Sequence, residues 1–367
     1  MFKIGNIEIP HYPLILAPME DVTDVSFRYI CKQYGADLMY TEFIASEALI
    51  RNIDKTVKKM HIEDYERPVG IQIYGHDPDH MVEAARMAAE MKPDIIDINC
   101  GCPVKKIATR GDGAGLLQTP DLMVEIARRV VEAVPEIPVT VKTRLGWDDN
   151  TKIIVSLAER LQDTGIQALA IHGRTRMQLY KGEADWTLIG EVKNNPRMHI
   201  PIIGNGDVDS PQKAKLMIDR YGIDAIMIGR AAVGCPWIFK TTKDYLATGV
   251  LPPEPDVHER VRLAKLQLSK SMEWKGDKRG ILEMRRHYSQ YFKALPDFKA
   301  YRMKLVTSMD VDEIFGLLDE IDATNLLATN FVGIARHHNR NFGNFGRFIQ
   351  IIQQPLRINA AARPCYG

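Results

Sequence analysis

The sequence feature that most constrains the fold is a series of eight short apolar runs that spans about 240 residues. The runs recur about every 30 residues, and most intervals between them contain a segment with helical periodicity, such as Leu122–Val134. Strands that alternate with helices over this length predict an α/β fold of the (β/α)8 TIM barrel type. The predicted strands are Leu14–Ala17, Leu38–Tyr40, Val69–Tyr74, Ile95–Ile98, Val139–Lys142, Ala168–Ile171, Ile202–Gly204 and Ala225–Ile228.

A doubly wound open sheet is the alternative arrangement for such an alternation. It is less favoured because no G-x-G-x-x-G motif follows an early strand. A barrel also predicts that polar functional residues gather at its carboxyl-terminal face, where the strands end. Each predicted strand ends in, or is followed by, such residues: Pro18 and Met19, Thr41 and Glu42, Gln72, Asn99 to Cys102, Lys142 and Arg144, His172, Asn205 to Asp207, and Gly229 and Arg230.

Glycine-bearing turns follow the last two strands, at Gly204–Asp207 and at Gly229–Arg230. In many barrels the corresponding loops bind a phosphate group through backbone N–H groups. Glycine permits a close approach of the backbone, and Arg230 would add a charge-assisted hydrogen bond. Either turn alone would be explained more simply as a tight connection, but the two together, in this order, predict a phosphate site.

Lys142 and His172 each end an apolar strand. A buried ammonium group needs an anionic partner, because an isolated buried charge is costly. For Lys142 this partner is either a carboxylate, such as Glu42 or Asp97, or an anionic cofactor, such as a reduced flavin. His172 is either a hydrogen-bonded histidine at the barrel rim or a donor to a cofactor or a substrate phosphate. The sequence leaves both pairs of alternatives open.

Two cysteines lie close together in the segment Asn99–Pro103. Their spacing is too short for a typical structural zinc pair, and the five cysteines of the chain fit a reducing cytoplasm rather than a disulfide framework. A cysteine on a Gly-Pro turn at the barrel mouth can instead donate a proton near neutral pH, because an unperturbed thiol has a pKa of about 8.5. Cys102 lies on this turn, whereas Cys100 is nearer the strand and more typical of a packing residue.

The charge distribution divides the chain into two regions. Residues 256–367 hold 18 Lys and Arg against 12 Asp and Glu, a net charge of +6, so the first 255 residues carry −5 within the overall +1. Three prolines in Gly249–Asp256 indicate a linker, and only helical periodicity follows it. We therefore predict a catalytic barrel over residues 1–248, a helical domain over residues 256–325 and a tail of unclear structure over residues 340–367.

One predicted helix of the second region lies between Gly280 and Pro296. Its spacing predicts a single buried face formed by Ile281, Met284, Tyr288, Tyr291 and Leu295. The segment from Arg260 to Lys304 contains 13 basic residues and only four acidic ones. Such an excess is either a solvated helical surface or the contact area for a phosphate-bearing partner.

Membrane insertion and secretion are not expected for this sequence. It has no run of about 18 apolar residues, and its first residues lack the apolar stretch of a signal peptide. We therefore expect a cytoplasmic protein.

Several segments form a pattern that covers roughly residues 5–325. They are Leu16–Asp24, Gln72–Gly75, Asp97–Pro103, Lys105–Lys106, Gly113–Leu117, Val141–Gly146, Ile171–Arg176, Asp185–Trp186, Gly204–Asp207 and Ile228–Ala231. This pattern resembles the tRNA-dihydrouridine synthases, which are FMN-dependent enzymes that reduce specific uridines in tRNA, and it is most similar to the bacterial B-type members. The tail beyond about Arg340 does not resemble the family.

The resemblance implies a set of site residues. Cys102 would be the general acid, and NADPH or NADH would reduce the flavin. FMN would be bound by residues at the strand ends, namely Ala17, Pro18, Met19, Gln72, Lys142, His172, Asn205, Gly206, Asp207, Gly229 and Arg230. The substrate would be contacted by polar and basic side chains, namely Asn99, Lys142, Arg144, Arg174, Arg279 and Arg286.

The activity implied by the resemblance is reduction of a D-loop uridine to 5,6-dihydrouridine. Hydride would pass from FMN N5 to uracil C6, and Cys102 would protonate C5. The partner would be tRNA, with no metal and no membrane involved. The protein would act as a monomer, because the face that binds RNA must stay open.

Three other functions fit parts of the pattern. A small-molecule FMN dehydrogenase of the dihydroorotate or dihydropyrimidine type explains the barrel motifs but not the basic helices. An RNA-binding protein built on an inactive barrel explains the basic helices but leaves Cys102 and Lys142 without a role. A phosphate-binding barrel lyase without flavin is the third alternative.

Overall fold

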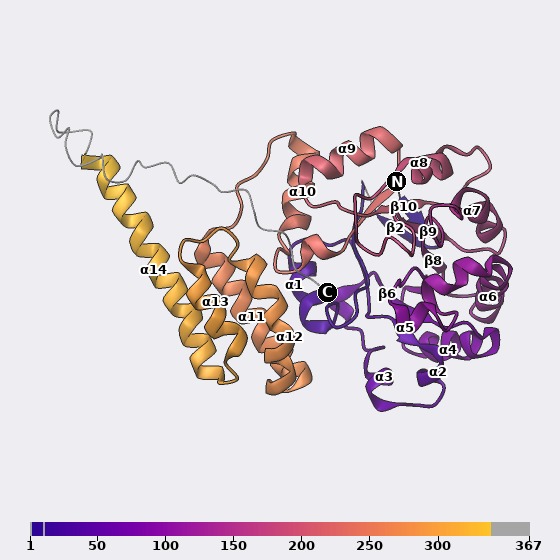
Figure 1. Ribbon diagram of the computed structural model, residues 1–367, viewed down its shortest axis with the longest axis horizontal. Helices are drawn as coiled ribbons and strands as arrows, with labels where there is room; N and C mark the ends of the chain where they lie inside the picture. The colour runs from indigo at the N-terminus through magenta and orange to yellow at the C-terminus, as the bar shows by residue number, and fades with distance from the viewer. Residues whose placement is uncertain (1, 10–11, 339–367) are drawn as a thin grey trace.

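The structure is a computed structural model and describes residues 2–9 and 12–338. The tail predicted over residues 340–367 lies outside the described residues. Figure 1 shows two parts side by side, an α/β part near the N-terminus and a group of helices formed by the last described residues.

The α/β part is a closed barrel of eight parallel strands, as predicted. Its strands pair in the order β4, β3, β11, β10, β9, β8, β7 and β6, and a pairing of β4 with β6 closes the ring. A two-residue strand, β5 (Ile44–Ala45), adds to β6. The barrel strands are β3 (Leu14–Leu16), β4 (Leu38–Tyr40), β6 (Val69–Tyr74), β7 (Ile95–Cys100), β8 (Val139–Arg144), β9 (Ala168–His172), β10 (Ile202–Asn205) and β11 (Ala225–Ile228).

The interior of the barrel changes from apolar to polar along the strands. Side chains near the strand starts, including Ile95 and Ala168, form an apolar cluster. A hairpin of β1 (Phe2–Ile4) and β2 (Ile7–Ile9) packs against this cluster and covers that end of the barrel. Because side chains alternate between the two faces of a strand, residues two and four positions after Ile95 also point inward, and these are polar. The barrel is therefore closed at one end and polar at the other.

Helices surround the barrel, and several begin at a residue that caps the first turn. Asp24, Asp77 and Ser210 accept hydrogen bonds from the backbone N–H three residues later, which satisfies donors that a helix leaves free. The helices are α1 (Val25–Gln33), α2 (Ser46–Leu49), α3 (Asp54–Lys58), α4 (Pro78–Glu90), α5 (Lys105–Ala108), α6 (Pro120–Ala133), α7 (Ile154–Gln162), α8 (Thr187–Asn194), α9 (Pro211–Tyr221) and α10 (Ile238–Thr248). Three 3-10 turns, η1 (Asp64–Glu66), η2 (Gly113–Gln118) and η3 (Arg230–Ala232), lie in the connecting loops.

The helical region packs around a second apolar core. It consists of α11 (Val257–Lys275), α12 (Asp277–Tyr291), α13 (Phe298–Thr307) and α14 (Val311–His338). The buried face predicted for α12 is confirmed, because Ile281, Met284, Tyr288 and Tyr291 all lie in this core. Leu295 lies beyond the end of α12 and packs against the same core. Within the described residues, no helix combines the length and the apolar character that crossing a membrane requires.

The predicted start of α12 after Gly280 is wrong, because the helix begins at Asp277 and passes through the glycine. A Cβ atom at Gly280 would lie only 2.7 Å from the backbone nitrogen of Met272 on α11. The glycine therefore lets two helices approach closely, and this packing gain outweighs its low helix propensity.

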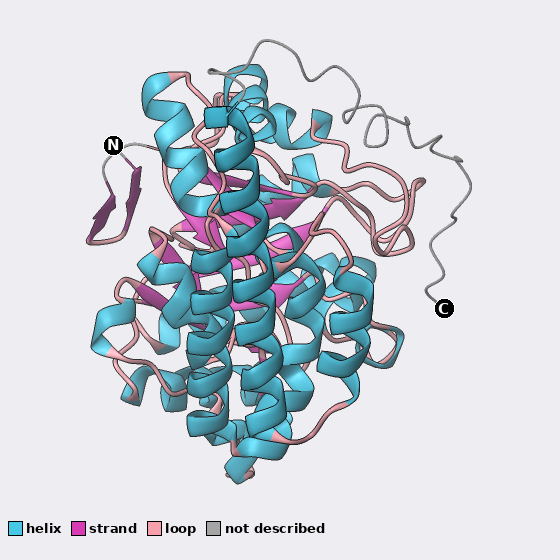
Figure 2. Cartoon of the chain, turned by 90° about the vertical axis from the view of Figure 1, so that its left-hand side faces the viewer, coloured by secondary structure: helices cyan, strands magenta, loops and turns pink. Residues whose placement is uncertain are grey.

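The helical region contacts the barrel where α11 and α12 approach α1. Lys275 lies between two carboxylates, Asp24 at 2.5 Å and Glu283, and is almost fully buried. Beside this group the rings of Phe27 and His287 lie 5.0 Å apart. Figure 2 looks from the side of the helical region and shows its long helices in front of the barrel strands. The two parts are thus joined by a buried, charged contact as well as by apolar packing.

Candidate active site

The carboxyl-terminal ends of the barrel strands surround a cavity of about 750 Å³. Its volume is typical of small-molecule and cofactor sites. Most of the predicted site residues line it, namely Ala17, Pro18, Met19, Asn99, Cys102, Lys142, Arg144, His172, Asn205, Gly206, Asp207, Gly229, Arg230 and Arg286. Gln72, Arg174 and Arg279 are not among the lining residues.

Lys142 presents its ammonium group to the cavity and forms no direct ion pair with a carboxylate among the described residues. Its Nζ donates a hydrogen bond of 3.3 Å to Asn205 Oδ1. Burial and the neighbouring Arg144 guanidinium lower the pKa of Lys142 to about 8. Of the two partners considered from the sequence, the carboxylate is therefore not the one observed, and the cation can attract an electron-rich group in the cavity.

The hydrogen-bond donors of the Arg174 guanidinium are all directed at groups of the protein. Its guanidinium binds both carboxylate oxygens of Asp207, at 2.9 and 2.5 Å, and also donates to the carbonyl oxygens of Lys181 and Gly182. Burial alone would raise the pKa of Asp207, but the hydrogen bonds from Arg174 and from the Ala184 N–H lower it below its usual value. The substrate contact predicted for Arg174 stays a prediction, and in this structure the side chain orients Asp207.

His172 is a neutral group at the cavity wall. Burial, together with the positive charges of Arg144, Lys142 and Arg174, holds the pKa of His172 well below its usual value. The Arg174 guanidinium approaches His172 Nε2 to 3.3 Å. Since a guanidinium can only donate, Nε2 accepts and Nδ1 carries the proton.

The turn after β10 can hold its position only with glycine. Gly206 has a φ of +126°, and a Cβ atom there would lie 2.7 Å from the Cβ of Ala184. Next to it, Arg230 donates a hydrogen bond of 3.0 Å to Asp207 Oδ1. The two turns predicted to bind phosphate therefore lie together at the cavity, with the Arg230 guanidinium fixed beside them.

Cys102 lies on a turn that is held from three sides. The carbonyl oxygen of Gly101 accepts a hydrogen bond of 2.8 Å from Arg144 Nε, and that of Cys102 accepts one of 3.1 Å from the Ala114 N–H. The third contact is a bond from the Cys102 N–H to Asn99 Oδ1. Burial raises the pKa of the Cys102 thiol, so it keeps its proton at neutral pH. Cys100 is buried in the hydrophobic core, as expected for a packing residue.

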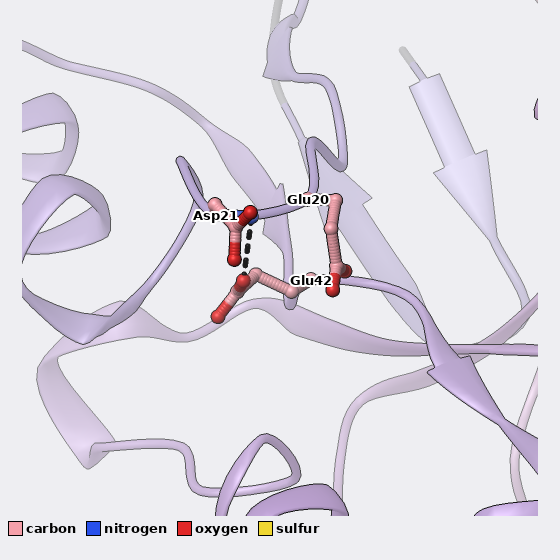
Figure 3. Close-up of side chains that lie close together, drawn as sticks. All are labelled: Glu20, Asp21 and Glu42. Atoms are coloured by element: carbon pink, nitrogen blue, oxygen red, sulfur yellow. Dashed lines mark hydrogen bonds between the residues drawn. The ribbon is translucent and has the colours of Figure 1, made fainter. Parts of the chain in front are cut away.

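Arg279 lies in a separate, smaller cleft between the barrel and the helical region. It pairs with Glu283 and approaches Asp21 to 3.6 Å. Asp21 belongs to a group of three carboxylates with Glu20 and Glu42, which Figure 3 shows in close-up with the bond of 2.7 Å from the Asp21 N–H to Glu42 Oε1. Lys59 pairs with Glu20 and Glu42, so each of the three carboxylates has a cation of the protein beside it.

Tyr180 is a cavity residue that the sequence analysis missed. It lies on the loop after β9, is half exposed, and has the guanidinium of Arg230 4.6 Å from its ring centroid. Its only sequence indication is an aromatic residue between basic ones, which is common on any surface loop. The fold, rather than the residue pattern, brings it to the cavity.

Arg286 is the one residue after the linker that lines the cavity among the residues described. It lies on α12 and has no carboxylate within ion-pair distance among the described residues. On α13 the side chains of Lys299, Arg302 and Lys304 are exposed and likewise without such a carboxylate among the described residues. Cations without an ion-pair partner among the described residues are therefore found both at the cavity and on α13.

A closed barrel with a buried thiol, a desolvated lysine and glycine-bearing turns at one cavity defines a (β/α)8-barrel enzyme. The sequence profile described as dihydrouridine synthase (Dus) matches residues 15–327, and the chain belongs to this family. It is 40% identical over 315 residues to tRNA-dihydrouridine synthase B of Pseudomonas aeruginosa, covering 84% of this chain and 92% of that protein. It is 41% identical over 291 residues to tRNA-dihydrouridine synthase B of Vibrio vulnificus, covering 79% of this chain and 89% of the relative.

Solved structures with a similar fold are more distant in sequence. The 6-hydroxypseudooxynicotine amine oxidase of Pseudomonas geniculata has a TM-score of 0.54 at 13% identity, over 72% of this chain and 51% of that one. An old yellow enzyme homologue from Zymomonas mobilis has a TM-score of 0.50 at 15% identity, over 68% of this chain and 92% of that one. At such identities the similarity shows the barrel fold alone.

Proposed function

We propose that this protein reduces D-loop uridines of tRNA to 5,6-dihydrouridine, with FMN as its cofactor and NADPH or NADH as the reductant. The observation that carries the proposal is the meeting of Cys102, Lys142 and Arg286 at one cavity in a chain of the dihydrouridine synthase family. Cys102 and Lys142 suit flavin-dependent reduction, and Arg286 belongs to the basic helical region that would bind the RNA. We propose that the protein acts as a monomer in the cytoplasm, without a metal.

The residues at the cavity fit a flavin mononucleotide. The unpaired ammonium of Lys142 suits the electron-rich side of a flavin ring, and the neutral His172 can donate one hydrogen bond from Nδ1. The backbone of Ala17–Met19 would border the ring, and the glycine-bearing turns would hold the phosphate through Asn205, Gly206, Asp207, Gly229 and Arg230. When bound, the flavin supplies hydride transfer to a pyrimidine ring.

The protein itself would supply the proton and the orientation of the base. Cys102 keeps its proton at neutral pH, so it can deliver one to uracil C5 as a general acid. Asn99, Lys142 and Arg144 line the same part of the cavity and are proposed to contact the uracil. Tyr180 offers an exposed ring at the rim against which a nucleoside can pack.

A uridine must leave its stack to reach this cavity. The cavity lies at the barrel mouth, so a base within a duplex or a tertiary core could enter only after it is flipped out. We propose that Arg286 and the cations of α13 bind phosphates of the tRNA while the base is inserted. The proposed domains are therefore a catalytic barrel over residues 1–248 and a tRNA-binding helical domain over residues 256–325.

The proposal is tested by incubating the purified protein with NADPH and tRNA from a strain that lacks dihydrouridine. We expect the protein to carry a flavin absorbance spectrum and to form dihydrouridine, detected by mass spectrometry of nucleosides. A colourless protein that does not take up FMN would contradict the cofactor assignment. A flavoprotein that reduces free pyrimidines such as uracil or orotate to their dihydro forms, but does not reduce tRNA, would identify the small-molecule dehydrogenase instead.

A further inference from the structure

Three buried side chains connect the barrel interior to the turn that carries Cys102. Asp97 lies on β7, Gln72 lies opposite it on β6, and Asn99 lies two residues further along β7 at the cavity. All three are almost completely buried. Only Asn99 of the three lines the cavity.

Hydrogen bonds join these residues in one continuous chain. Gln72 Nε2 donates to Asp97 Oδ2 at 2.5 Å, and Asn99 Nδ2 donates to Gln72 Oε1 at 2.8 Å. Asn99 Oδ1 then accepts from the N–H groups of Gly101 and Cys102, at 3.0 and 2.9 Å. The chain runs without interruption from a buried carboxylate to the backbone of the proposed acid.

The direction of every bond in the chain is set by its two ends. Burial raises the pKa of Asp97 to about 7, and above that pH its carboxylate can only accept, so Asp97 draws the amide nitrogen of Gln72 and leaves the oxygen of Gln72 for Asn99. Asn99 must then turn its nitrogen toward Gln72 and its oxygen toward the turn. Backbone N–H groups can only donate, so the far end requires the same direction. If Gln72 turned over, Asn99 would have to turn as well, and two N–H groups would face a donor.

We infer that Asp97 and Gln72 are positioning residues that fix the orientation of the Asn99 carboxamide and thereby hold the Cys102 turn. The same direction leaves the second N–H of Asn99 Nδ2 without an acceptor among the described residues. Asn99 therefore offers a donor, not an acceptor, to a ligand in the cavity, which suits a carbonyl oxygen. The effect on turnover rests on the proposed function, whereas the effect on the turn does not.

The test is hydrogen–deuterium exchange of the Gly101 and Cys102 amides in the full chain, measured above pH 7 so that Asp97 is ionised, together with turnover. In the Asp97→Asn variant, residue 97 can present either an oxygen or a nitrogen to Gln72, so only the N–H groups of the turn still impose the direction. We expect exchange of the two amides to become at least about tenfold faster and dihydrouridine formation to fall by up to about 100-fold, because a misplaced acid loses its alignment with the substrate.

A double variant separates direction from simple loss of a contact. In Gln72→Glu/Asp97→Asn the carboxylate moves to residue 72, where it accepts from both neighbouring amides, so Asn99 keeps its native direction. We expect the protection of the two amides to return to within about threefold of the parent.

A matched control removes the other hydrogen bond of Asp97. Thr140 Oγ1 donates to Asp97 Oδ1 at 2.5 Å and has no part in the chain. Thr140→Val should lower the melting temperature but leave the two amides protected. If the double variant does not fold, a comparison of amide exchange in Asp97→Asn with that in Thr140→Val still decides whether Asp97 holds the Cys102 turn.

Two results would overturn the inference: unchanged protection in Asp97→Asn, or a folded double variant no better protected than Asp97→Asn. If the parent forms no dihydrouridine at all, the proposed function fails, while amide exchange still reports on the chain.

Discussion

The barrel mouth and helix α13 both carry several cations, but in opposite surroundings. At the mouth, Arg144 and Arg174 are buried and bound by protein oxygens, and Lys142 faces a cavity. On α13, the cations at residues 299, 302 and 304 are exposed to water. A cation removed from water interacts strongly with a ligand but is costly to bury, whereas an exposed cation interacts weakly and is screened by salt.

The difference indicates a division of labour. Desolvated groups at fixed positions suit bond-making chemistry, because their alignment need not change during the reaction. Exposed cations suit recognition of a long, charged surface such as an RNA backbone, where each contact contributes little. Substitutions in the barrel should therefore alter turnover, and substitutions on α13 should alter affinity.

The largest effect is expected for Cys102→Ala. Removal of the general acid should lower the rate of dihydrouridine formation by roughly 10²- to 10⁴-fold, while flavin absorbance and tRNA affinity stay near those of the parent. The measurement is a single-turnover assay with saturating tRNA. Cys100→Ala is the matched control, because this neighbouring thiol is buried in the hydrophobic core. Near-normal turnover in Cys102→Ala would remove this residue from the acid role.

The second substitution breaks the junction between the two regions. Lys275→Met leaves the buried carboxylates of Asp24 and Glu283 facing each other without the cation between them. We expect the free energy of unfolding, measured by urea titration, to fall by about 3 kcal/mol. Lys240→Met removes an exposed pair with Asp244 and should cause no measurable change. Equal stability of the two variants would show that the junction depends on apolar packing alone.

The third prediction concerns recognition by α13. The triple variant Lys299→Ala/Arg302→Ala/Lys304→Ala should weaken tRNA binding by about 10- to 100-fold and reduce the slope of log affinity against log salt by about 2 to 3. Turnover at saturating tRNA should not change. The control is Lys215→Ala/Lys240→Ala, which removes two exposed cations that pair within α9 and α10. An unchanged salt dependence would place the RNA contact elsewhere.

The sequence predicts the barrel more completely than it predicts the site. Eight apolar runs at regular spacing admit few folds, and polar residues at strand ends must then meet at one face. The order of residues does not reveal how each charge is paired. Arg174 was expected at the substrate, yet it is bound to Asp207, a carboxylate that only the folded chain brings near. Arg279 was expected there too, but it pairs with Glu283 one helical turn away and approaches Asp21 of the barrel. Tyr180 was missed for the same reason, since its loop has no periodic pattern.

The smallest effect is expected for Lys142→Met in the flavin-free protein, and it depends on pH. The folded chain holds the pKa of Lys142 at about 8, against 10.5 for a free lysine, so the unfolded chain binds more protons between these values. Below pH 8, burial of the ammonium therefore lowers the free energy of unfolding by its full amount. This loss of stability disappears as the pH rises toward 10.5.

Because the Lys142 side chain keeps some exposure at the cavity, solvent reduces the cost of its burial, and we expect the Lys142→Met variant to be more stable than the parent by about 1 kcal/mol at pH 7 and equally stable near pH 10.5. Urea titrations at both pH values provide the measurement. Lys304→Met on α13 should show no difference at either pH, because its ammonium is already in water. A variant at Lys142 that is less stable than the parent at pH 7 would mean that this cation contributes to the fold, and the contrast between the two regions would then fail at its central residue.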